Sequence, residues 1–422
     1  MPEGVRYEGS EADGARMSGV VQKYGGSSVA NAERILNVAG RVARRRATGE
    51  PMVVVVSAMG DTTDELIALA RQVTERPADR EMDLLLSTGE IISCTLLAMA
   101  LRERGVPARS FTGAQAGILT DRSHGRARIL GVEPARLQRC LNDGEVAIVA
   151  GFQGITPETD VTTLGRGGSD TTAVALAAAL GARCCEIYTD VKGVYTCDPR
   201  IEPAARKLDV ISYEEMLEMA SQGSRVMHPR AVELCAIHGI PILVASSLVD
   251  APGTMIQETS EMEPSNKVRG ISHDIHIAKV TVVGTPDRPG IAAAIFRRLT
   301  EAGILVDAIV QNASVHSDAT DLSFTVNSDD LLRAQDALND QVLALGCREL
   351  LTNDSLGKVS IVGTGVLNTP GYASRMFGVL ADAGINIELI TTSEIRITCI
   401  IEQDRVPDAV RALHAAFQLD EG

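Results

Sequence analysis

Thr162-Thr163-Leu164-Gly165-Arg166-Gly167-Gly168-Ser169-Asp170-Thr171-Thr172-Ala173 is the stretch that decides the fold of this chain. It follows an apolar run, Val146 to Phe152, which predicts a buried strand, and it precedes a run of small residues, Ala173 to Gly181, which predicts a helix. The glycines therefore fall where a loop enters a helix. The first N–H groups of a helix have no partner within it, so this position suits an anion.

Two charged residues in this stretch strengthen that interpretation. The guanidinium of Arg166 fits a carboxylate or a phosphate, and Asp170 supplies a countercharge for a lysine or a metal ion. The alternative is a plain strand-to-helix turn, because glycine turns are common.

The composition excludes several classes of function. The chain has 422 residues, enough for two or three domains, with a net charge of −15 and a pI near 5.0. An acidic chain without tryptophan argues against a nucleic-acid surface and against attraction to anionic lipid. An anionic substrate would need local cations, so individual arginines and lysines become informative.

The cysteines and the first residues point to a cytoplasmic protein. The eight cysteines include the adjacent pair Cys184 and Cys185 but no C-x-x-C motif, so we expect reduced, buried thiols. Residues 1–17 are polar and acidic, which predicts a disordered tail rather than a signal peptide, and Met17 is an alternative start. No apolar run approaches the roughly 18 residues that a membrane span needs.

A second glycine turn lies near the start of the chain. The strand Val20 to Lys23 enters Tyr24-Gly25-Gly26-Ser27-Ser28, and a helix is expected over Asn31 to Arg46. Backbone N–H groups of such a loop cradle phosphates, with Lys23 as a point charge. The alternative is a structural lysine at the end of a strand.

Polar residues follow another predicted strand, Met52 to Val56, whose β-branched run is typical of a buried parallel sheet. Ser57 and Thr63 are candidate substrate hydroxyls at its end, or simply part of a helix cap. Glu90 is expected at the start of a helix over Ile91 to Arg104. There it either complements the helix dipole or binds a substrate ammonium.

Two further segments have the character of ligand-binding loops. In the segment Glu186 to Arg200, acid, glycine, aromatic and basic residues alternate, so it could hold a nucleotide, with Tyr195 beside the base and Arg200 near phosphate. The segment Gly223 to Arg230 follows an amphipathic helix. His228 within it lacks a Ser, Cys or metal-ligand partner in the sequence, so we interpret it as structural.

The last third of the chain is a repeat. Lys279 to Gly284 matches Lys358 to Gly363, and both copies continue with Pro-Gly and then Ala-Gly-Ile. The step from Gly290 to Gly303 is 13 residues, as is the step from Gly371 to Gly384. Each copy reads β-α-β-β-α, a ferredoxin-like pattern. A repeated module without a nucleophile suggests a sensor or pairing domain.

Four segments together resemble the aspartate kinase family: Lys23 to Ser28, Thr163 to Asp170, Tyr188 to Arg200 and Gly223 to Arg230. They stand in the family's order within an amino-acid-kinase domain, and two ACT modules follow, so the resemblance covers nearly all of residues 18–420. It implies transfer of the ATP γ-phosphate to the side-chain carboxylate of L-aspartate, giving 4-phospho-L-aspartate. That is the first step towards lysine, threonine, methionine and isoleucine.

The resemblance also implies an α/β fold. We expect a three-layer α/β/α kinase domain with a mainly parallel sheet, then two ferredoxin-like βαββαβ ACT modules. The expected boundaries are a disordered tail over 1–17, the kinase domain over 18–248, a linker over 249–269, and ACT modules over 270–352 and 353–422.

The implied chemistry needs no general base, since a carboxylate is already anionic at neutral pH. It needs positioning and charge neutralisation. By resemblance, Lys23 contacts the transferred phosphate, Asp170 orients that lysine, and Arg166 pairs with the α-carboxylate of aspartate. ATP and Mg²⁺ are the expected cofactors, with Mg²⁺ bridging ATP oxygens mostly through water rather than through protein ligands.

The resemblance assigns further residues to two pockets. Residues implied to contact ATP are Lys23, Tyr24, Gly25, Gly26, Thr189, Asp190, Tyr195, Thr196, Cys197, Asp198, Pro199, Arg200, Arg225 and Val226. Those implied to contact aspartate are Ser57, Thr63, Glu90, Arg166, Gly167, Gly168 and Ser169, with Glu90 holding the ammonium. The family often has lysine at the position of Arg225.

The ACT modules imply feedback inhibition by lysine, threonine or both. Implied effector contacts are Asp287, Arg288, Pro289, Gly290, Ile291, Ala292, Leu305, Val306, Asp307 and Gln311 in the first module, and Tyr372, Ala373, Asn386, Ile387, Ser393 and Glu394 in the second. The alternative is that these polar residues only join an interface. The loop Ala313 to Thr320 is shorter than in close relatives, which predicts altered sensitivity.

ACT modules typically pair, so the resemblance also implies a homo-oligomer. Met262 offers an internal start for a separate regulatory subunit in an α2β2 assembly.

Three rival interpretations are weaker. Another amino-acid kinase, acting on glutamate, acetylglutamate or UMP, does not account for the paired modules together with Arg166 and Glu90. A non-enzymatic amino-acid sensor would need a damaged site, yet Lys23, Arg166 and Asp170 are all present. A nicotinamide enzyme would need a strand followed by G-x-G-x-x-G, which is missing.

Overall fold

The computed structural model describes residues 19–259, 266–311 and 319–421. Met17, Met262 and most of the loop Ala313 to Thr320 lie outside the described residues. The chain divides into two compact units, Met1–Gly193 with Arg230–Glu258 and Val194–Pro229 with Thr259–Gly422. We describe each unit by itself and, following the resemblance stated above, call the first the catalytic unit and the second the regulatory unit. The segment 194–229, expected in the first domain, groups with the regulatory unit, and the other predicted boundaries stay predictions.

A mainly parallel sheet forms the centre of the catalytic unit, as predicted. Its strands follow the order β12-β11-β9-β1-β2-β6-β3, and only β11 and β12 pair antiparallel among these. β2 and β6 are wholly buried, as expected for a sheet covered on both faces. The strands are β1 (Val20–Tyr24), β2 (Met52–Val56), β3 (Ala108–Phe111), β6 (Val146–Ala150), β9 (Cys184–Thr189), β11 (Ile242–Ser246) and β12 (Thr254–Ile256).

β12 lies in the segment expected to be a linker. Its residues pair with β11 from Ile242 opposite Ile256 to Val244 opposite Thr254. Gly253 makes this approach possible, since a Cβ there would lie 2.3 Å from the backbone oxygen of Val244.

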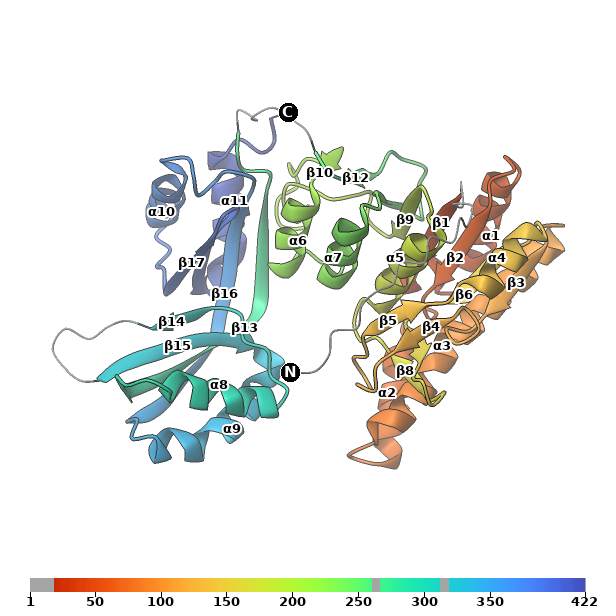
Figure 1. Cartoon of the computed structure of the whole chain (residues 1–422). Helices are drawn as coiled ribbons and strands as arrows, with labels where there is room; N and C mark the ends of the chain where they lie inside the picture. Colours follow the sequence, from red (N-terminus) through yellow and green to blue (C-terminus); the bar gives the residue numbers. More distant parts are fainter. Residues whose placement is uncertain (1–18, 260–265, 312–318, 422) are drawn as a thin grey trace. The chain divides into compact units, whose positions relative to one another are not determined.

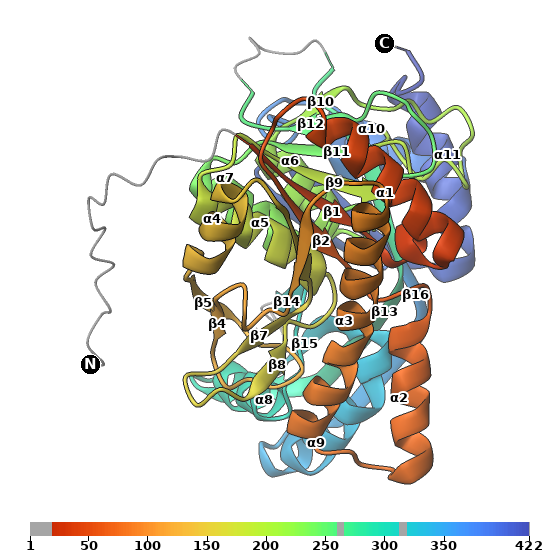
Figure 2. The same cartoon turned by 90° about the vertical axis from the view of Figure 1, so that its right-hand side faces the viewer.

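Helices cover both faces of this sheet, which confirms the three-layer prediction. α1 (Ala32–Arg46) and α3 (Asp79–Glu103) share one hydrophobic core with the sheet. α4 (Ala135–Asn142), α5 (Gly168–Leu180) and α7 (Pro229–His238) lie on the opposite face, as Figure 2 shows. The remaining helix, α2 (Thr62–Val73), contacts α3.

α3 begins a full 12 residues earlier than the predicted helix over Ile91 to Arg104. The sequence Ser87-Thr88-Gly89 reads as a turn, but both hydroxyls donate to carbonyls one turn back within the helix. Gly89 is needed because a Cβ there would lie 2.9 Å from the Cβ of Ala58. Glu90 is therefore in the middle of a helix, and the interpretation that it complements a helix start is wrong.

α3 contains an 18-residue window that is apolar on average, although polar residues interrupt it. Within the described ranges, it is the helix long and apolar enough to cross a membrane by length and composition. Half of its most apolar window is buried inside the protein, and core helices pass the same test.

A small second sheet follows the order β5-β4-β7-β8. Its strands are β4 (Ile118–Thr120), β5 (Ile129–Val132), β7 (Gln153–Ile155) and β8 (Val161–Thr163). β3 and β4 are close in the sequence but belong to two different sheets. The chain turns between them at Gly113, where a Cβ would lie 2.2 Å from the backbone oxygen of Gln153, and at Gly117, whose φ is +81°.

The regulatory unit contains both repeat copies in one antiparallel sheet of order β14-β15-β13-β16-β18-β17 (Figure 1). The strands are β13 (Gly270–Pro286), β14 (Ile309–Gln311), β15 (Ala319–Asn327), β16 (Glu349–Val362), β17 (Leu389–Ser393) and β18 (Arg396–Glu402). The helices are α8 (Ile291–Glu301), α9 (Leu331–Ala344), α10 (Tyr372–Asp382) and α11 (Val406–Ala416). The ferredoxin-like prediction is confirmed.

One feature of this sheet was not predicted. The last strand of the first copy and the first strand of the second copy form the single 14-residue strand β16. β13 is likewise continuous over 17 residues. The two strands pair from Gly270 opposite Val362 to Val283 opposite Glu349, with two irregularities, so the modules share their central strands.

Each module has its own hydrophobic core. α8 and α9 pack on β13 and β15 around Phe324, and α10 and α11 pack on β16 and β18 around Ile361 and Met376. The segment 194–229 contributes β10 (Val210–Ile211) and α6 (Tyr213–Ser221), which begins with a capping box between Ser212 and Glu215.

All eight cysteines are buried and none forms a disulfide. Burial raises the pKa of the Cys94 thiol to about 12, which keeps it protonated and unreactive.

Candidate functional site

Lys23 and Asp170, both predicted as catalytic, lie side by side. Lys23 is the fourth residue of β1, and Asp170 is in the first turn of α5. The Nζ of Lys23 lies 2.7 Å from Oδ1 of Asp170, and the two side chains are only 12% and 11% exposed. An ammonium with a fixed counterion and little water around it is suited to contact a second anion.

The predicted glycine loop leaves space beside this ammonium. A Cβ on Gly25 would lie 3.4 Å from the Nζ of Lys23, and one on Gly26 would lie 3.0 Å from the backbone oxygen of Ala58. Gly25 also donates its N–H to the carbonyl of Tyr188. Tyr24 itself is buried and stacks on Tyr188, so its ring belongs to the core.

The stretch that decides the fold forms the predicted loop and helix start, but the helix begins at Gly168 rather than near Ala173. Gly167 precedes it with a φ of +67°, a conformation that favours glycine. Ser169 and Asp170 are therefore in the first helical turn. Arg166 is exposed, and its side chain makes no hydrogen bond or ion pair with the described residues.

The sequence analysis missed Phe152, which lies beside this loop. Its φ of +68° is unusual for a residue with a side chain, and its N–H donates to the hydroxyl of Thr172. A Cβ on Gly168 would lie 2.8 Å from its ring. Such strained residues cluster at functional sites. The sequence signal that could have identified Phe152 was its position at the end of the predicted strand Val146 to Phe152.

Glu90 is a buried carboxylate without a cation. It is 3% exposed, and its Oε1 accepts the N–H of Ala58 at 3.2 Å. Its Oε2 has no hydrogen-bond partner within the described parts of the chain. Burial raises the pKa of Glu90 to about 7. Ser57 immediately precedes Ala58, and Thr63 lies in the first turn of α2, so both are near the end of β2.

The predicted nucleotide contacts divide between the two units. Thr189 ends β9 in the catalytic unit, and its hydroxyl donates to the carboxylate of Asp190. Those in the regulatory unit differ in exposure. Thr196 and Cys197 are buried, Tyr195, Asp198 and Val226 are half-buried, and Pro199, Arg200 and Arg225 are exposed.

Two of these residues are part of the regulatory unit's interior. The hydroxyl of Thr196 lies 3.0 Å from Nε2 of His414 in α11, and Cys197 packs in the core of the second module. Asp198 forms an ion pair with Arg200 at 2.7 Å. Thr196, Asp198 and Arg200 therefore already have hydrogen-bond or ion-pair partners within this unit, and Cys197 is packed in its core.

The predicted effector residues of the two modules have different surroundings. In the first module Leu305 is 81% exposed, and the other exposed members are Asp287, Arg288, Pro289, Gly290, Asp307 and Gln311, with Ile291 buried and Ala292 and Val306 half-buried. In the second, the hydroxyl of Tyr372 accepts the N–H of Lys267, and the hydroxyl of Ser393 donates to Glu218 of α6. Ala373 and Ile387 are half-buried, and Asn386 and Glu394 are exposed.

Two matching ion pairs join the modules. Lys358 of β16 lies 2.7 Å from Asp307, and Lys279 of β13 lies 2.7 Å from Glu388. The four residues occupy equivalent positions in the repeat, so each copy supplies one lysine and one acid.

Known domain families match most of the chain. The Amino acid kinase family matches residues 18–246, and the ACT domain family matches residues 280–342 and 359–417. The fold agrees with a kinase of this class joined to a pair of ACT domains.

The chain belongs to the aspartokinases. It is 52% identical over 407 residues to an aspartokinase from Mycolicibacterium smegmatis, covering 96% of this chain and 97% of that protein. It is 51% identical over 406 residues to one from Thermus thermophilus, covering 96% and 100%. It is therefore a phosphotransferase that acts on a carboxyl group, with allosteric ACT domains.

Solved structures agree with this assignment. The structure of Escherichia coli aspartokinase III in complex with aspartate and ADP, described as the R-state, has a TM-score of 0.81 and 29% identity, covering 94% of this chain and 99% of that one. The structure of the same enzyme with lysine and aspartate, described as the T-state, has a TM-score of 0.73 and 28% identity, covering 95% and 99%.

Proposed function

We propose that this aspartokinase transfers the γ-phosphate of ATP to L-aspartate at the Lys23–Asp170 pair, in the cytoplasm, as the first step towards lysine, threonine, methionine and isoleucine. The observation that carries the proposal is the nearly buried ammonium of Lys23, held 2.7 Å from Asp170 beside a glycine loop. The E. coli relative solved with aspartate and ADP supports the choice of ligands.

In this proposal two anions meet at the end of the parallel sheet. The side-chain carboxylate of aspartate attacks the γ-phosphorus, the bond to the β–γ bridging oxygen breaks, and ADP leaves. Lys23 neutralises charge on the transferred phosphoryl group, and Asp170 keeps its ammonium in place. Because the nucleophile is already anionic, no side chain needs to remove a proton.

Aspartate recognition is assigned to groups of opposite charge. The exposed guanidinium of Arg166 would pair with the α-carboxylate. Glu90, whose Oε2 lacks a partner in the described structure, would take the ammonium. Ser57, Thr63, Gly167, Gly168 and Ser169 would complete the pocket.

Within the catalytic unit, ATP is assigned to the glycine loop and to the segment around Thr189. In the part of the chain that the structure describes, no group of three or more His, Cys, Asp or Glu could hold a metal ion. A Mg²⁺ ion would therefore take its ligands from phosphate oxygens and water, where it would offset phosphate charge.

The regulatory proposal is feedback inhibition by lysine, threonine or both, through the ACT modules. The E. coli structure with lysine and aspartate supports lysine. The exposed residue Gln311 is the better candidate for an effector contact, because Tyr372 and Ser393 of the second module are already hydrogen-bonded and Asp307 is already paired with Lys358. The sheet ends at β14 and β17, which would allow a homo-oligomer to form through these edges.

The test is ADP release by the purified protein with ATP, Mg²⁺ and L-aspartate, with hydroxylamine present to trap the acyl phosphate. We expect aspartate-dependent turnover, no trapped product from glutamate or acetylglutamate, and no ADP release with UMP. Repeating the assay with lysine, threonine and both together tests regulation. Phosphate transfer to another acceptor in place of aspartate would overturn the proposed substrate, and unchanged turnover with both amino acids would overturn the proposed inhibition.

A further inference from the structure

Asp83 is a fully buried carboxylate that none of the proposed chemistry uses. It lies in α3 two helical turns before Glu90, and therefore on the same side of that helix. A carboxylate with no exposed surface is costly unless its oxygens are hydrogen-bonded, so its partners show what its burial achieves.

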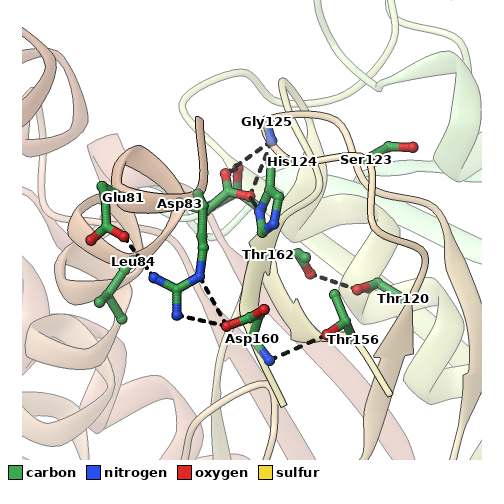
Figure 3. A network of polar contacts seen from close by, with 12 residues as sticks. Glu81, Asp83, Leu84, Thr120, Ser123, His124, Gly125, Thr156, Asp160 and Thr162 are labelled. Carbon is green, nitrogen blue, oxygen red and sulfur yellow. Dashed lines mark hydrogen bonds and ion pairs between the residues drawn. The ribbon is translucent and has the colours of Figure 1, made fainter. Parts of the chain in front are cut away.

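Three groups from two other segments surround Asp83. Its Oδ2 lies 2.7 Å from Nδ1 of His124, and its Oδ1 accepts the N–H of Gly125 at 3.0 Å and the hydroxyl of Thr163. Figure 3 shows His124 and Gly125 facing the carboxylate. A single side chain of α3 thus holds both the turn between β4 and β5 and the end of β8.

The segment held in this way carries Arg166. Thr163 is the last residue of β8, three residues before Arg166, and its carbonyl accepts the N–H of Ala127. Gly165 lies directly against the turn, since a Cβ there would be 3.1 Å from the carbonyl oxygen of Gly125. Because the side chain of Arg166 has no protein partner in the described structure, the backbone alone sets its place.

We propose that Asp83 is a positioning residue for substrate: it fixes the backbone that presents Arg166 in relation to Glu90 on the same helix. The inference rests on the proposed function, in which Arg166 and Glu90 bind opposite ends of one aspartate. A binding site for two fixed charges is sensitive to small errors in their separation.

The chain contains a matched control on the same helix. Arg80 forms an ion pair at 2.7 Å with Asp160, which directly precedes β8. This pair also connects α3 to the residue before β8 of the small sheet, but its side chains are 54% and 37% exposed. Changing Arg80 removes a connection between α3 and the small sheet. It leaves the turn at His124 and Gly125, which lies against Gly165, unchanged.

The first experiment compares Asp83→Asn with Arg80→Gln. Asparagine keeps the size of the side chain but replaces one acceptor oxygen with a donor. We expect the KM for L-aspartate to rise about tenfold or more in Asp83→Asn, since two charged contacts lose alignment, while the KM for ATP stays within about twofold. Arg80→Gln should leave both values within about twofold. An equal rise in both KM values, or the same effect from Arg80→Gln, would contradict the proposal.

A second pair of variants tests the hydroxyl contact. Thr163→Val removes the donor to Asp83 at nearly constant volume, and Thr163→Ser keeps it. We expect a raised KM for aspartate in the valine variant and recovery to within about twofold of the native value in the serine variant. Equal behaviour of the two would show that packing rather than the hydrogen bond matters.

Amide hydrogen exchange supplies a readout that does not need catalysis. In Asp83→Asn, peptides covering 163–167 and 122–128 should exchange faster, while peptides covering 20–26 should not change. If the native protein fails to turn over aspartate, the proposed function fails. The exchange data then still decide whether Asp83 holds the Arg166 loop, and unchanged exchange in both segments would overturn that role.

Discussion

The catalytic and regulatory units each hold a lysine 2.7 Å from an aspartate, but the two pairs are built differently. In the Lys23–Asp170 pair both side chains are nearly buried, and glycines leave space beside the ammonium. In the Lys358–Asp307 pair the lysine is 6% exposed and the aspartate 48%. The first arrangement leaves the cation ready for another anion. The second ties a buried cation of one module to an acid at the surface of the other.

The equal lysine–aspartate distances of the two pairs therefore do not imply equal roles. The regulatory pair has a repeat-related copy, Lys279 with Glu388, as expected of contacts that join duplicated modules. The catalytic unit instead has Glu90, a buried carboxylate with no cation, and burial raises its pKa to about 7. Four substitutions test this difference between the two units.

The largest effect is expected from Lys23→Met. Losing a cation that stabilises the transferred phosphoryl group should lower kcat about 100- to 1000-fold. The check is aspartate-dependent ADP release under saturating ATP, with circular dichroism as the control for folding. Activity within about tenfold of the native enzyme would mean that the catalytic pair, like the regulatory one, is structural.

The next effect concerns Glu90 and pH. Its folded-state pKa of about 7 lies above the ordinary value of 4.5, so the folded state binds more protons between these limits. Its contribution to stability is therefore full below pH 4.5 and is lost as pH rises through 7, by up to about 3 kcal/mol. Urea unfolding from pH 5 to pH 8 should show this loss, and Glu90→Gln should flatten it. The same slope in both proteins would contradict the assignment.

A smaller effect is expected from Asp307→Asn. This change leaves the buried ammonium of Lys358 without a countercharge and should cost about 2 kcal/mol, less than for a fully buried pair because Asp307 is half exposed. Urea unfolding measures the loss. The same variant should respond less to lysine or threonine if Asp307 also contacts the effector.

The smallest effect is expected from the matched variant Glu388→Gln. Its partner Lys279 is 21% exposed, so water can replace the lost contact and the cost should stay below about 1 kcal/mol. A loss as large as that of Asp307→Asn would mean that the two repeat-related pairs contribute equally, and that exposure is not what separates them.

The sequence was informative where one physical cause dominates. Continuous β-branched residues predicted β2, and glycines beside charged residues predicted the Lys23 and Arg166 loops. The repeat spacing predicted both ferredoxin-like modules, because equal spacing over whole elements rarely arises by chance. These signals are local or periodic, so a single chain reveals them.

Other features depend on contacts that no local pattern records. In the sequence Asp83 is one acidic residue within a helix. Only the fold shows that His124 and Thr163 contact it. Ser87-Thr88-Gly89 reads as a turn, yet its hydroxyls bond within α3. Asn353-Asp354-Ser355 reads as a break between modules, but β16 continues through it, because Asn353 and Leu356 on either side pair with Lys279 and Ile277 of β13.

The continuity of β13 and β16 has a consequence for unfolding. β13 pairs with β15 on one side and with β16 on the other, and β16 in turn pairs with β18. Neither module can lose its central strand without breaking backbone hydrogen bonds of the other. The two modules should therefore melt as one cooperative transition, with no populated species in which one copy is folded and the other is a free chain.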